Sequence, residues 1–219
     1  MIKKITLLVL FLSAAVFAQE NGKSKAFSKY LFGGYAGISF NTIPTIGGAF
    51  QIAIETNLTS RLDLKAIIGY STIYENKEYT VNSYTTRVVD GEAVYQTITY
   101  DVDKIQYSVI PVGLGFEYTF SEAQFAPFAA LEFAYNSNGS EEQITQSISG
   151  NTYDSKDDIP DEFRDPRPEV NSDNFVSVGI GGGIKYRISD SIEFDLKYVF
   201  QYNTNDIPVT HQILFGVML

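Results

Sequence analysis

Apolar and polar side chains alternate residue by residue along eight stretches of this sequence. The stretches cover residues 30–40, 47–58, 61–75, 104–120, 125–136, 174–188, 191–203 and 209–219. In the second stretch, Phe50, Ile52 and Ile54 share one parity, and Gln51 and Glu55 share the other. A period of two is typical of a β-strand, because successive side chains point to opposite faces. The pattern predicts an all-β protein of eight strands.

The connections between these strands alternate between short and long. Only two to four residues join the second strand to the third, the fourth to the fifth and the sixth to the seventh. The other connections include two long segments, at 76–103 and 137–173. This organisation is typical of an antiparallel up-and-down barrel with short turns at one end and large loops at the other. An even number of strands places both ends of the barrel domain on the side of the short turns.

The two faces of the strands differ in charge. One face is almost uncharged, as at Ile110, Val112 and Leu114 in the fourth strand. The other face is rich in glycine and carries ten charged residues: Glu55, Asp63, Lys65, Glu117, Glu132, Lys185, Arg187, Glu193, Asp195 and Lys197. A soluble barrel with these charges inside would expose its apolar band to water, which favours aggregation. The sequence therefore predicts an eight-stranded antiparallel transmembrane β-barrel, with its apolar face toward lipid and its charged face lining the lumen.

The first 18 residues have the features of a secretory signal peptide. Lys3 and Lys4 precede an apolar run, and Val16 and Ala18 provide small residues before a predicted cleavage at Gln19. Residues 19–219 then form one barrel domain, and cleavage changes the formal net charge from −10 to −12 by removing the two lysines. Such an acidic chain is not expected to bind nucleic acid. The sequence has no cysteine, so it can form neither a disulfide nor a thiolate metal site.

Two predicted hairpins carry a resemblance to a known family. They read YSVIPVGLGFEYTF followed by APFAALEFAY, and VGIGGGIKYRIS followed by DSIEFDLKYVF. Both resemble the small outer-membrane β-barrel family, the OmpA/OmpX-like outer membrane protein β-barrel domain. The resemblance implies location in the outer membrane of a Gram-negative-type envelope, with membrane lipid and the barrel-assembly machinery as partners and no cofactor. Tyr and Phe must supply the interfacial aromatic side chains, because the sequence has no Trp.

The predicted lumen holds six acids and four bases. An eight-stranded barrel is only wide enough for side chains to fill it, so we expect a plug of paired charges. With more acids than bases, we expect some acids to lack a basic partner. A proton or ion path, and therefore a narrow pore, is the alternative.

Catalysis on lipid is a second alternative, since acyl transfer or deacylation would need a nucleophile and a base. The single histidine, His211, shares the parity of the lipid-facing residues Ile213 and Phe215. No strand register that we can derive places a serine beside it. We therefore predict that the protein is not an enzyme.

The long segment at 137–173 contains ten acids and three bases. Its run DSKDDIPDE offers oxygen ligands for calcium, but the spacing does not match an EF-hand. The favoured interpretation is a solvated, mobile surface loop. The predicted function is non-enzymatic, in envelope structure or in contacts of the loops at 76–103 and 137–173 with an extracellular ligand.

The long segment at 76–103 is rich in strand-forming residues on both sides of Asp90-Gly91, a hairpin signal. We expect the third and fourth strands to continue as a two-stranded ribbon beyond the membrane. Outward residues are even-numbered in both strands, and paired residues share a face. A three-residue loop that pairs Val88 with Glu92 keeps this parity, and a β-bulge elsewhere in the ribbon is the alternative.

Overall fold

The computed structural model describes residues 26–41, 45–164, 173–189 and 192–219, so the predicted signal peptide lies outside the described part. The strands are β1 (Tyr30–Phe40), β2 (Ile46–Asn57), β3 (Leu62–Val89), β4 (Glu92–Thr119), β5 (Phe125–Tyr153), β6 (Phe175–Ser189), β7 (Ile192–Asn203) and β8 (Thr210–Met218). Two short 3₁₀ helices follow β5, η2 (Lys156–Asp158) and η3 (Asp161–Phe163). Among the described residues, no helix is both long and apolar enough to cross a membrane.

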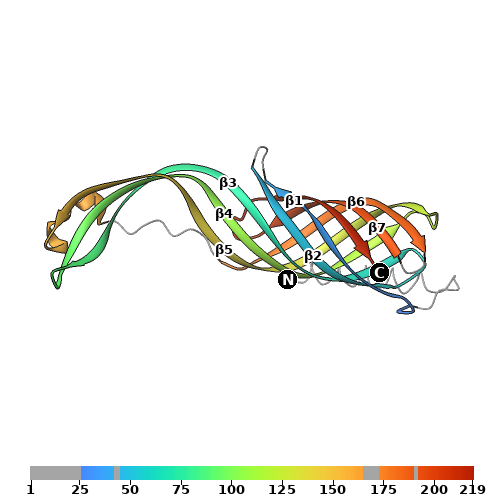
Figure 1. The fold of residues 1–219 in the computed structure, drawn as a ribbon. Helices are drawn as coiled ribbons and strands as arrows, with labels where there is room; N and C mark the ends of the chain where they lie inside the picture. Colours follow the sequence, from blue (N-terminus) through green and yellow to red (C-terminus); the bar gives the residue numbers. More distant parts are fainter. Residues whose placement is uncertain (1–25, 42–44, 165–172, 190–191) are drawn as a thin grey trace, which may run out of the picture. The chain divides into compact units, whose positions relative to one another are not determined.

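The eight strands form a closed barrel in which each is hydrogen-bonded to its neighbours in sequence order (Figure 1). Closure is made by β1 and β8, which pair antiparallel from Gly33↔Met218 to Phe40↔His211. The strands approach closely at this seam, because a Cβ at Gly37 would lie 1.9 Å from the carbonyl oxygen of Ile213. The predicted eight-stranded antiparallel up-and-down barrel is confirmed.

The chain forms two compact units, and the long strands β3, β4 and β5 contribute to both. Of the described residues, the barrel contains 26–41, 45–73, 108–138, 173–189 and 192–219. The second unit, here called the extension, contains residues 74–107 and 139–164.

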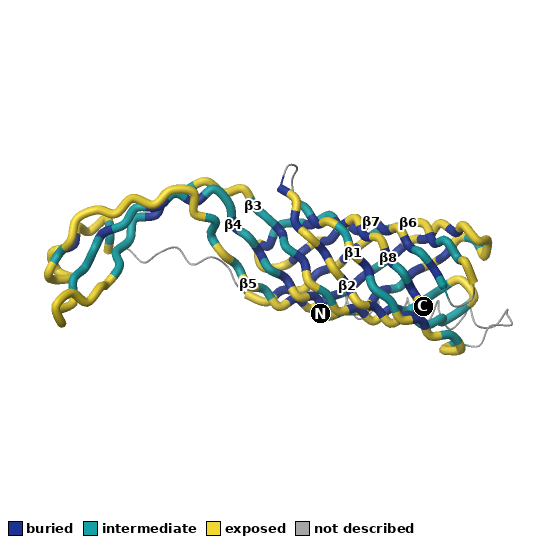
Figure 2. Tube along the Cα trace, viewed as in Figure 1, coloured by how far each residue is buried: buried dark blue, intermediate teal, exposed yellow. Residues whose placement is uncertain are grey.

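The wall of the barrel alternates between exposed and buried residues, as Figure 2 shows along each strand. On β2, Phe50 and Ile52 are about half exposed, whereas Gln51 and Glu55 are buried. The same alternation places Ile110, Val112 and Leu114 of β4 on the outer surface. The outside is therefore an apolar band suited to lipid, and the polar face is enclosed, as the sequence predicts.

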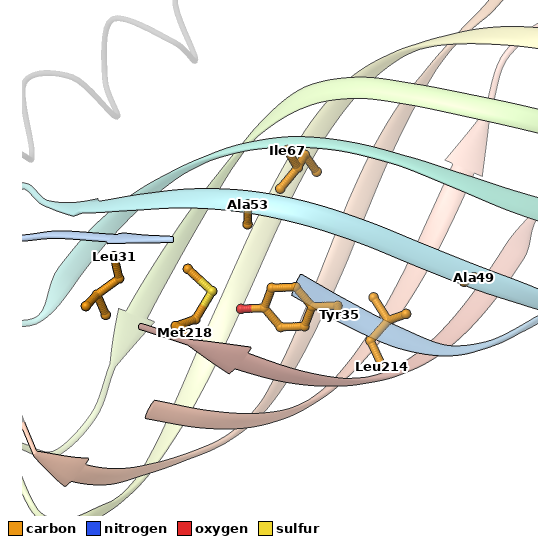
Figure 3. Packing of buried hydrophobic residues seen from close by; sticks show 7 residues of the cluster. All are labelled: Leu31, Tyr35, Ala49, Ala53, Ile67, Leu214 and Met218. Carbon is orange, nitrogen blue, oxygen red and sulfur yellow. The ribbon is translucent and has the colours of Figure 1, made fainter. Parts of the chain in front are cut away.

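One part of the lumen is apolar. Side chains from β1, β2, β3 and β8 pack there into a single cluster (Figure 3). Its members are Leu31, Tyr35, Ala49, Ala53, Ile67, Leu214 and Met218. Tyr35 is the largest of them, and its ring packs against Gly216, where a Cβ would lie 2.3 Å from Tyr35 Cδ1. The cluster fills its side of the barrel with side chains and places the Tyr35 hydroxyl toward the charged residues.

The extension is a three-stranded antiparallel sheet with β4 in the middle. Val81, Tyr100 and Val102 form its buried cluster, against which Tyr79 and Ile98 pack. The prediction that the fifth strand ends at residue 136 is wrong, because β5 continues to Tyr153. The acids at 137–173 gather mainly beyond residue 153, so the uncharged run that starts at residue 143 can pair along β4. Residues 137–153 of the predicted mobile loop therefore belong to strand β5.

The ribbon predicted for 76–103 is confirmed, but its three-residue loop is wrong. The turn has two residues, Asp90 and Gly91, with φ of 54° and 89°. Two positive φ values are typical of a type I′ turn, whose twist matches that of the strands.

The two-residue turn pairs Val89 with Glu92, an odd-numbered with an even-numbered residue, whereas outward residues are even-numbered in both barrel strands. The shift of one residue that this requires occurs inside β4. The buried side chains Tyr100 and Val102 are even-numbered, whereas the buried Ile105 and Tyr107 are odd-numbered. The alternation of β4 is therefore interrupted between Val102 and Ile105, which reconciles a two-residue turn with the parity of the barrel strands.

Candidate functional site: the charged interior of the barrel

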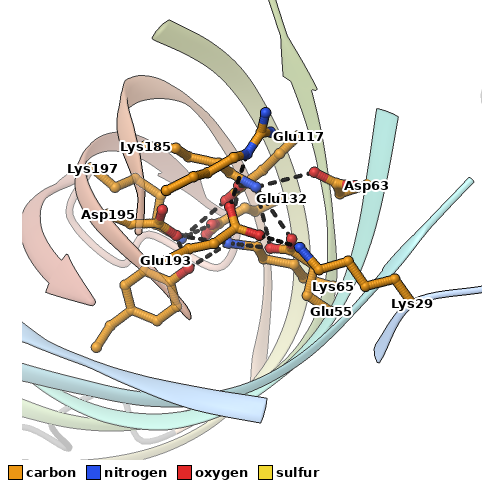
Figure 4. A network of polar contacts seen from close by, with 12 residues as sticks. Lys29, Glu55, Asp63, Lys65, Glu117, Glu132, Lys185, Glu193, Asp195 and Lys197 are labelled. Atoms are coloured by element: carbon orange, nitrogen blue, oxygen red, sulfur yellow. Dashed lines mark hydrogen bonds and ion pairs between the residues drawn. The ribbon is translucent and has the colours of Figure 1, made fainter. Parts of the chain in front are cut away.

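The ten charged residues predicted to line the lumen come from β2 to β7 and gather in one region of the barrel (Figure 4). Eight of them are buried, with at most 4% of their surface exposed: Glu55, Lys65, Glu117, Glu132, Lys185, Glu193, Asp195 and Lys197. The side chains of Asp63 and Arg187 are 14% and 25% exposed. Charges so deeply buried persist only when they are paired.

Lys65 occupies the centre of this network. Its Nζ lies 2.9 Å from Glu55 Oε2, 2.9 Å from Glu117 Oε2 and 3.2 Å from Asp195 Oδ2. It also donates a hydrogen bond to the hydroxyl of Tyr35. One ammonium group therefore forms ion pairs with three carboxylates from three different strands.

Lys185 shares two of these carboxylates. Its Nζ lies 3.1 Å from Glu117 Oε2, 3.3 Å from Glu55 Oε2 and 3.1 Å from Asp63 Oδ2. Glu55 is on β2 and Lys185 on β6, four strands apart in the closed ring of eight, so this pair connects opposite parts of the wall. Sharing of this kind holds the carboxylates at fixed positions inside the lumen.

Tyr35 joins the network from the apolar side. Its hydroxyl donates to Asp195 Oδ2 at 2.5 Å. The Nζ atoms of Lys65 and Lys197 lie 4.9 Å and 4.6 Å from the centre of its ring, within the range of a cation–π interaction. Lys197 also pairs with Glu132, at 2.6 Å.

Every one of the six acids has a basic partner, so the expectation of unpaired acids is wrong. Glu193 is paired with Lys29 at 2.7 Å and with Arg187 at 3.4 Å. Two members of the network were not predicted from the sequence. Lys29 lies just before the predicted first strand, and Tyr35 is uncharged, although its odd number places it on the lumen face of β1. Five bases can provide a partner for all six acids because Lys65 and Lys185 each contact three of them.

The carboxylates of Glu55, Glu117 and Asp195 each offer one oxygen within 4.8 Å of the others, a spacing that could hold a metal ion. Lys65 Nζ pairs with all three, so a lysine supplies the positive charge there. The acids of the loop considered for calcium form no such group among the residues that the structure describes.

A polar cavity of about 440 Å³ opens at the end of the barrel with the short turns. It is bordered by the turns that follow β2 and β4 and by Ser28 and Lys29, which precede β1. Asp63, Arg187 and Glu193 line it, so the cavity reaches the outer members of the charge network. Past these residues the lumen is occupied by the buried ion pairs and by the apolar cluster around Tyr35.

His211 lies on the outer face of β8, as its parity predicts. Its ring stacks on Phe40 and meets Phe200 edge-on, each with a centroid distance of 5.2 Å. Its Nδ1 lies 2.7 Å from the hydroxyl oxygen of Tyr198. These contacts give the imidazole a packing role within an aromatic cluster on the lipid-facing surface.

The comparisons agree with this architecture. The sequence matches the family described as "Outer membrane protein beta-barrel domain" over residues 5–219. No curated protein matches it. Among solved structures, neisserial surface protein A is similar with a TM-score of 0.51 and 11% identity, over 90% of this chain and 99% of that one.

Two further structures give lower scores. The N-terminal β-barrel domain of Pseudomonas aeruginosa OprF has a TM-score of 0.46 and 12% identity, over 89% of this chain and 100% of that one. Ail, the attachment invasion locus protein of Yersinia pestis, has a TM-score of 0.42 and 9% identity, over 86% of this chain and 95% of that one.

Proposed function

The chain belongs to the outer membrane protein beta-barrel domain family, and from this premise we propose that it is a non-enzymatic surface protein. In this proposal the barrel anchors the chain in the outer membrane. The extension makes the contacts with molecules outside the cell. Function in such scaffolds lies in the loops more than in the fold.

The observation that carries this proposal is the internal order of the extension. A solvated loop would have neither a strand ladder nor buried side chains, whereas the extension has three paired strands and the cluster of Val81, Tyr100 and Val102. Tyr79 donates a hydrogen bond to Glu142 at 2.6 Å, which joins β3 to β5. A rigid surface loses less conformational entropy when it binds a partner.

The segment that follows β5 adds further order. Ile159 is fully buried, and Lys156 Nζ lies 5.7 Å from the centre of the Tyr84 ring. The guanidinium of Arg164 donates to the backbone oxygens of Asp157 and Ile159. These contacts give the short 3₁₀ turns a defined shape on the ribbon.

The side chains of the lumen support an anchoring role for the barrel. An ion would have to pass residues such as Lys65 and Lys185, each of which forms ion pairs with three carboxylates. Opening a path would separate buried ion pairs, and this costs several kcal/mol for each ion.

The test compares the full chain with a barrel that lacks the extension. In this variant a two-residue Asn-Gly turn replaces residues 74–106 and another replaces 137–174, which keeps inward residues opposite inward residues. We expect both proteins to enter the outer membrane and to migrate differently before and after boiling. Cells with the full chain should be retained on arrays of host proteins and glycans, and cells with the short barrel should not. Equal retention of the two would contradict the proposal.

The pore and enzyme alternatives have separate tests. Steady conductance through single barrels in planar bilayers would contradict a plugged lumen. Release of fatty acid from phospholipid or lipopolysaccharide by the purified protein would contradict a non-enzymatic role.

A further inference from the structure

The outer edge of β5 in the extension has the properties of a self-complementary binding surface. We propose that two copies of this chain bind each other by antiparallel pairing of residues 139–153, centred on Gln146. This inference rests on the proposed function, because it makes a second copy the partner of the extension.

The edge is open along this segment. On one side β5 is hydrogen-bonded to β4, and on the other side β6 pairs with it from Phe125↔Tyr186 only as far as Asn136↔Phe175. Within the described ranges no other strand pairs with the outer edge of β5 beyond that point. An edge strand presents backbone N–H and C=O groups that can pair with another strand.

This edge lacks the protection that natural edges usually have. Charged side chains and proline normally prevent pairing between sheet edges. The opposite edge of the same sheet, on β3, carries Glu75, Lys77, Glu78 and Arg87 within residues 74–89. The β5 edge has neither charge nor proline from Gln143 to Tyr153. The uncharged run is therefore longer on β5, with eleven residues, than on β3, where it covers the eight residues from Tyr79 to Thr86.

Two exposed isoleucines mark the same stretch. Ile144 and Ile148 are 51% and 56% exposed, and they lie on one face because they are four residues apart on a continuous strand. Exposed β-branched side chains on an uncharged edge are costly in water unless another surface covers them.

The sequence around Gln146 favours a second copy as that surface. If Gln146 lies opposite itself, Ile144 of each copy lies opposite Ile148 of the other, so both isoleucines gain an apolar neighbour. The same register places Gly139 opposite Tyr153, so the whole part of β5 in the extension is paired with itself.

Charge disfavours the register centred on Ile148, whereas registers centred on Thr145 or Ser147 keep the acids apart but no longer place Ile144 opposite Ile148. With Gln146 at the centre, Glu141 faces Asn151 and Glu142 faces Gly150, so no acid faces an acid. A register centred on Ile148 would place Glu142 opposite Asp154, and like charges directly opposite each other are destabilising. The remaining acids of the two extensions repel at long range, and salt screens this repulsion. Pairing should therefore strengthen as ionic strength rises.

Cross-linking in intact outer membranes tests the register, since the chain has no cysteine of its own. Gln146→Cys should give dimers with a short bis-maleimide, because position 146 faces itself. Ser149→Cys alone should stay monomeric, because the two positions are offset by six residues, roughly 20 Å along the strand. Gln143→Cys and Ser149→Cys copies should cross-link when they are mixed, because these positions face each other. Mixing them in one membrane or on separate cells distinguishes pairing within a membrane from pairing between cells.

Charge reversal tests the energetics. Ile144→Lys with Ile148→Lys should abolish the cross-link of Gln146→Cys, and copies carrying Ile144→Glu with Ile148→Glu should restore it when mixed with the lysine variant. Val88→Lys, on the other edge, is the matched control and should leave the cross-link unchanged. Heat-dependent migration confirms that each barrel is folded.

Three outcomes would overturn the inference. They are a monomeric Gln146→Cys in folded barrels, equal cross-linking by Ser149→Cys alone, and cross-linking only to a different protein. None of them contradicts a role of the extension in surface contacts, which fails only if the truncated barrel binds as the full chain does.

Discussion

Replacing Lys65 with Met removes the ammonium group that holds three carboxylates together. Lys65 Nζ lies within 3.2 Å of Glu55, Glu117 and Asp195, and its side chain is 1% exposed. Met fills most of the same volume, so the lost charge dominates the effect. Leaving buried charges uncompensated costs about 3–5 kcal/mol of folding free energy. For an m-value of about 1–3 kcal/mol per M, the urea midpoint should fall by roughly 1–5 M.

The assay follows the heat-dependent band shift of the purified barrel in lipid vesicles along a urea series. Arg187→Met is the matched control, because Arg187 is 25% exposed and makes an ion pair of 3.4 Å with Glu193. Its loss should cost at most about 1 kcal/mol, as for pairs near the surface. The reasoning is refuted if Lys65→Met leaves the midpoint unchanged, or if the two variants lose the same stability.

Three further predictions concern the same region. Tyr35→Phe should lower stability by roughly 1–3 kcal/mol in the urea assay, because buried Asp195 loses a donor while the ring contacts remain; an unchanged midpoint would show that the hydroxyl is dispensable. Gly216→Ala should reduce folded yield in membranes, because its Cβ would lie 2.3 Å from Tyr35 Cδ1, whereas Gly48→Ala has nothing within 4 Å and should fold normally; equal yields would contradict the close packing. In Lys65→Ala, which removes the long side chain as well as its charge, millimolar Ca²⁺ should recover part of the lost stability and a chelator should remove it, since three carboxylate oxygens lie within 4.8 Å of one another; identical urea curves with Ca²⁺ and with chelator would refute this.

The faces of the barrel strands could be predicted from the sequence because alternation is a local property. Ile110 and Glu117 fall on opposite faces by parity alone, and a lipid environment determines which face is outside. The barrel fold could also be predicted, because eight alternating strands joined by short turns can close into a ring.

The pairing inside the lumen could not be predicted in this way. Which lysine meets Glu55 depends on the register of strands that are far apart in sequence, and Lys185 is 130 residues away. A count of acids and bases assumes one partner each, whereas Lys65 serves three acids. The end of β5 was misjudged for a related reason, because the composition of 137–173 as a whole concealed an uncharged run from Gln143 to Tyr153.

The character of β8 has a consequence for how the barrel is assembled. This strand is the last of the eight in chain order, and it pairs with both β1 and β7. Its five inward residues are all uncharged: Thr210, Gln212, Leu214, Gly216 and Met218. The ion pairs of the lumen join Lys29 and residues of β2 to β7, so they can form before β8 is added. The eighth strand can then complete the barrel without bringing a charge of its own into the lumen, where burial of a charge is costly.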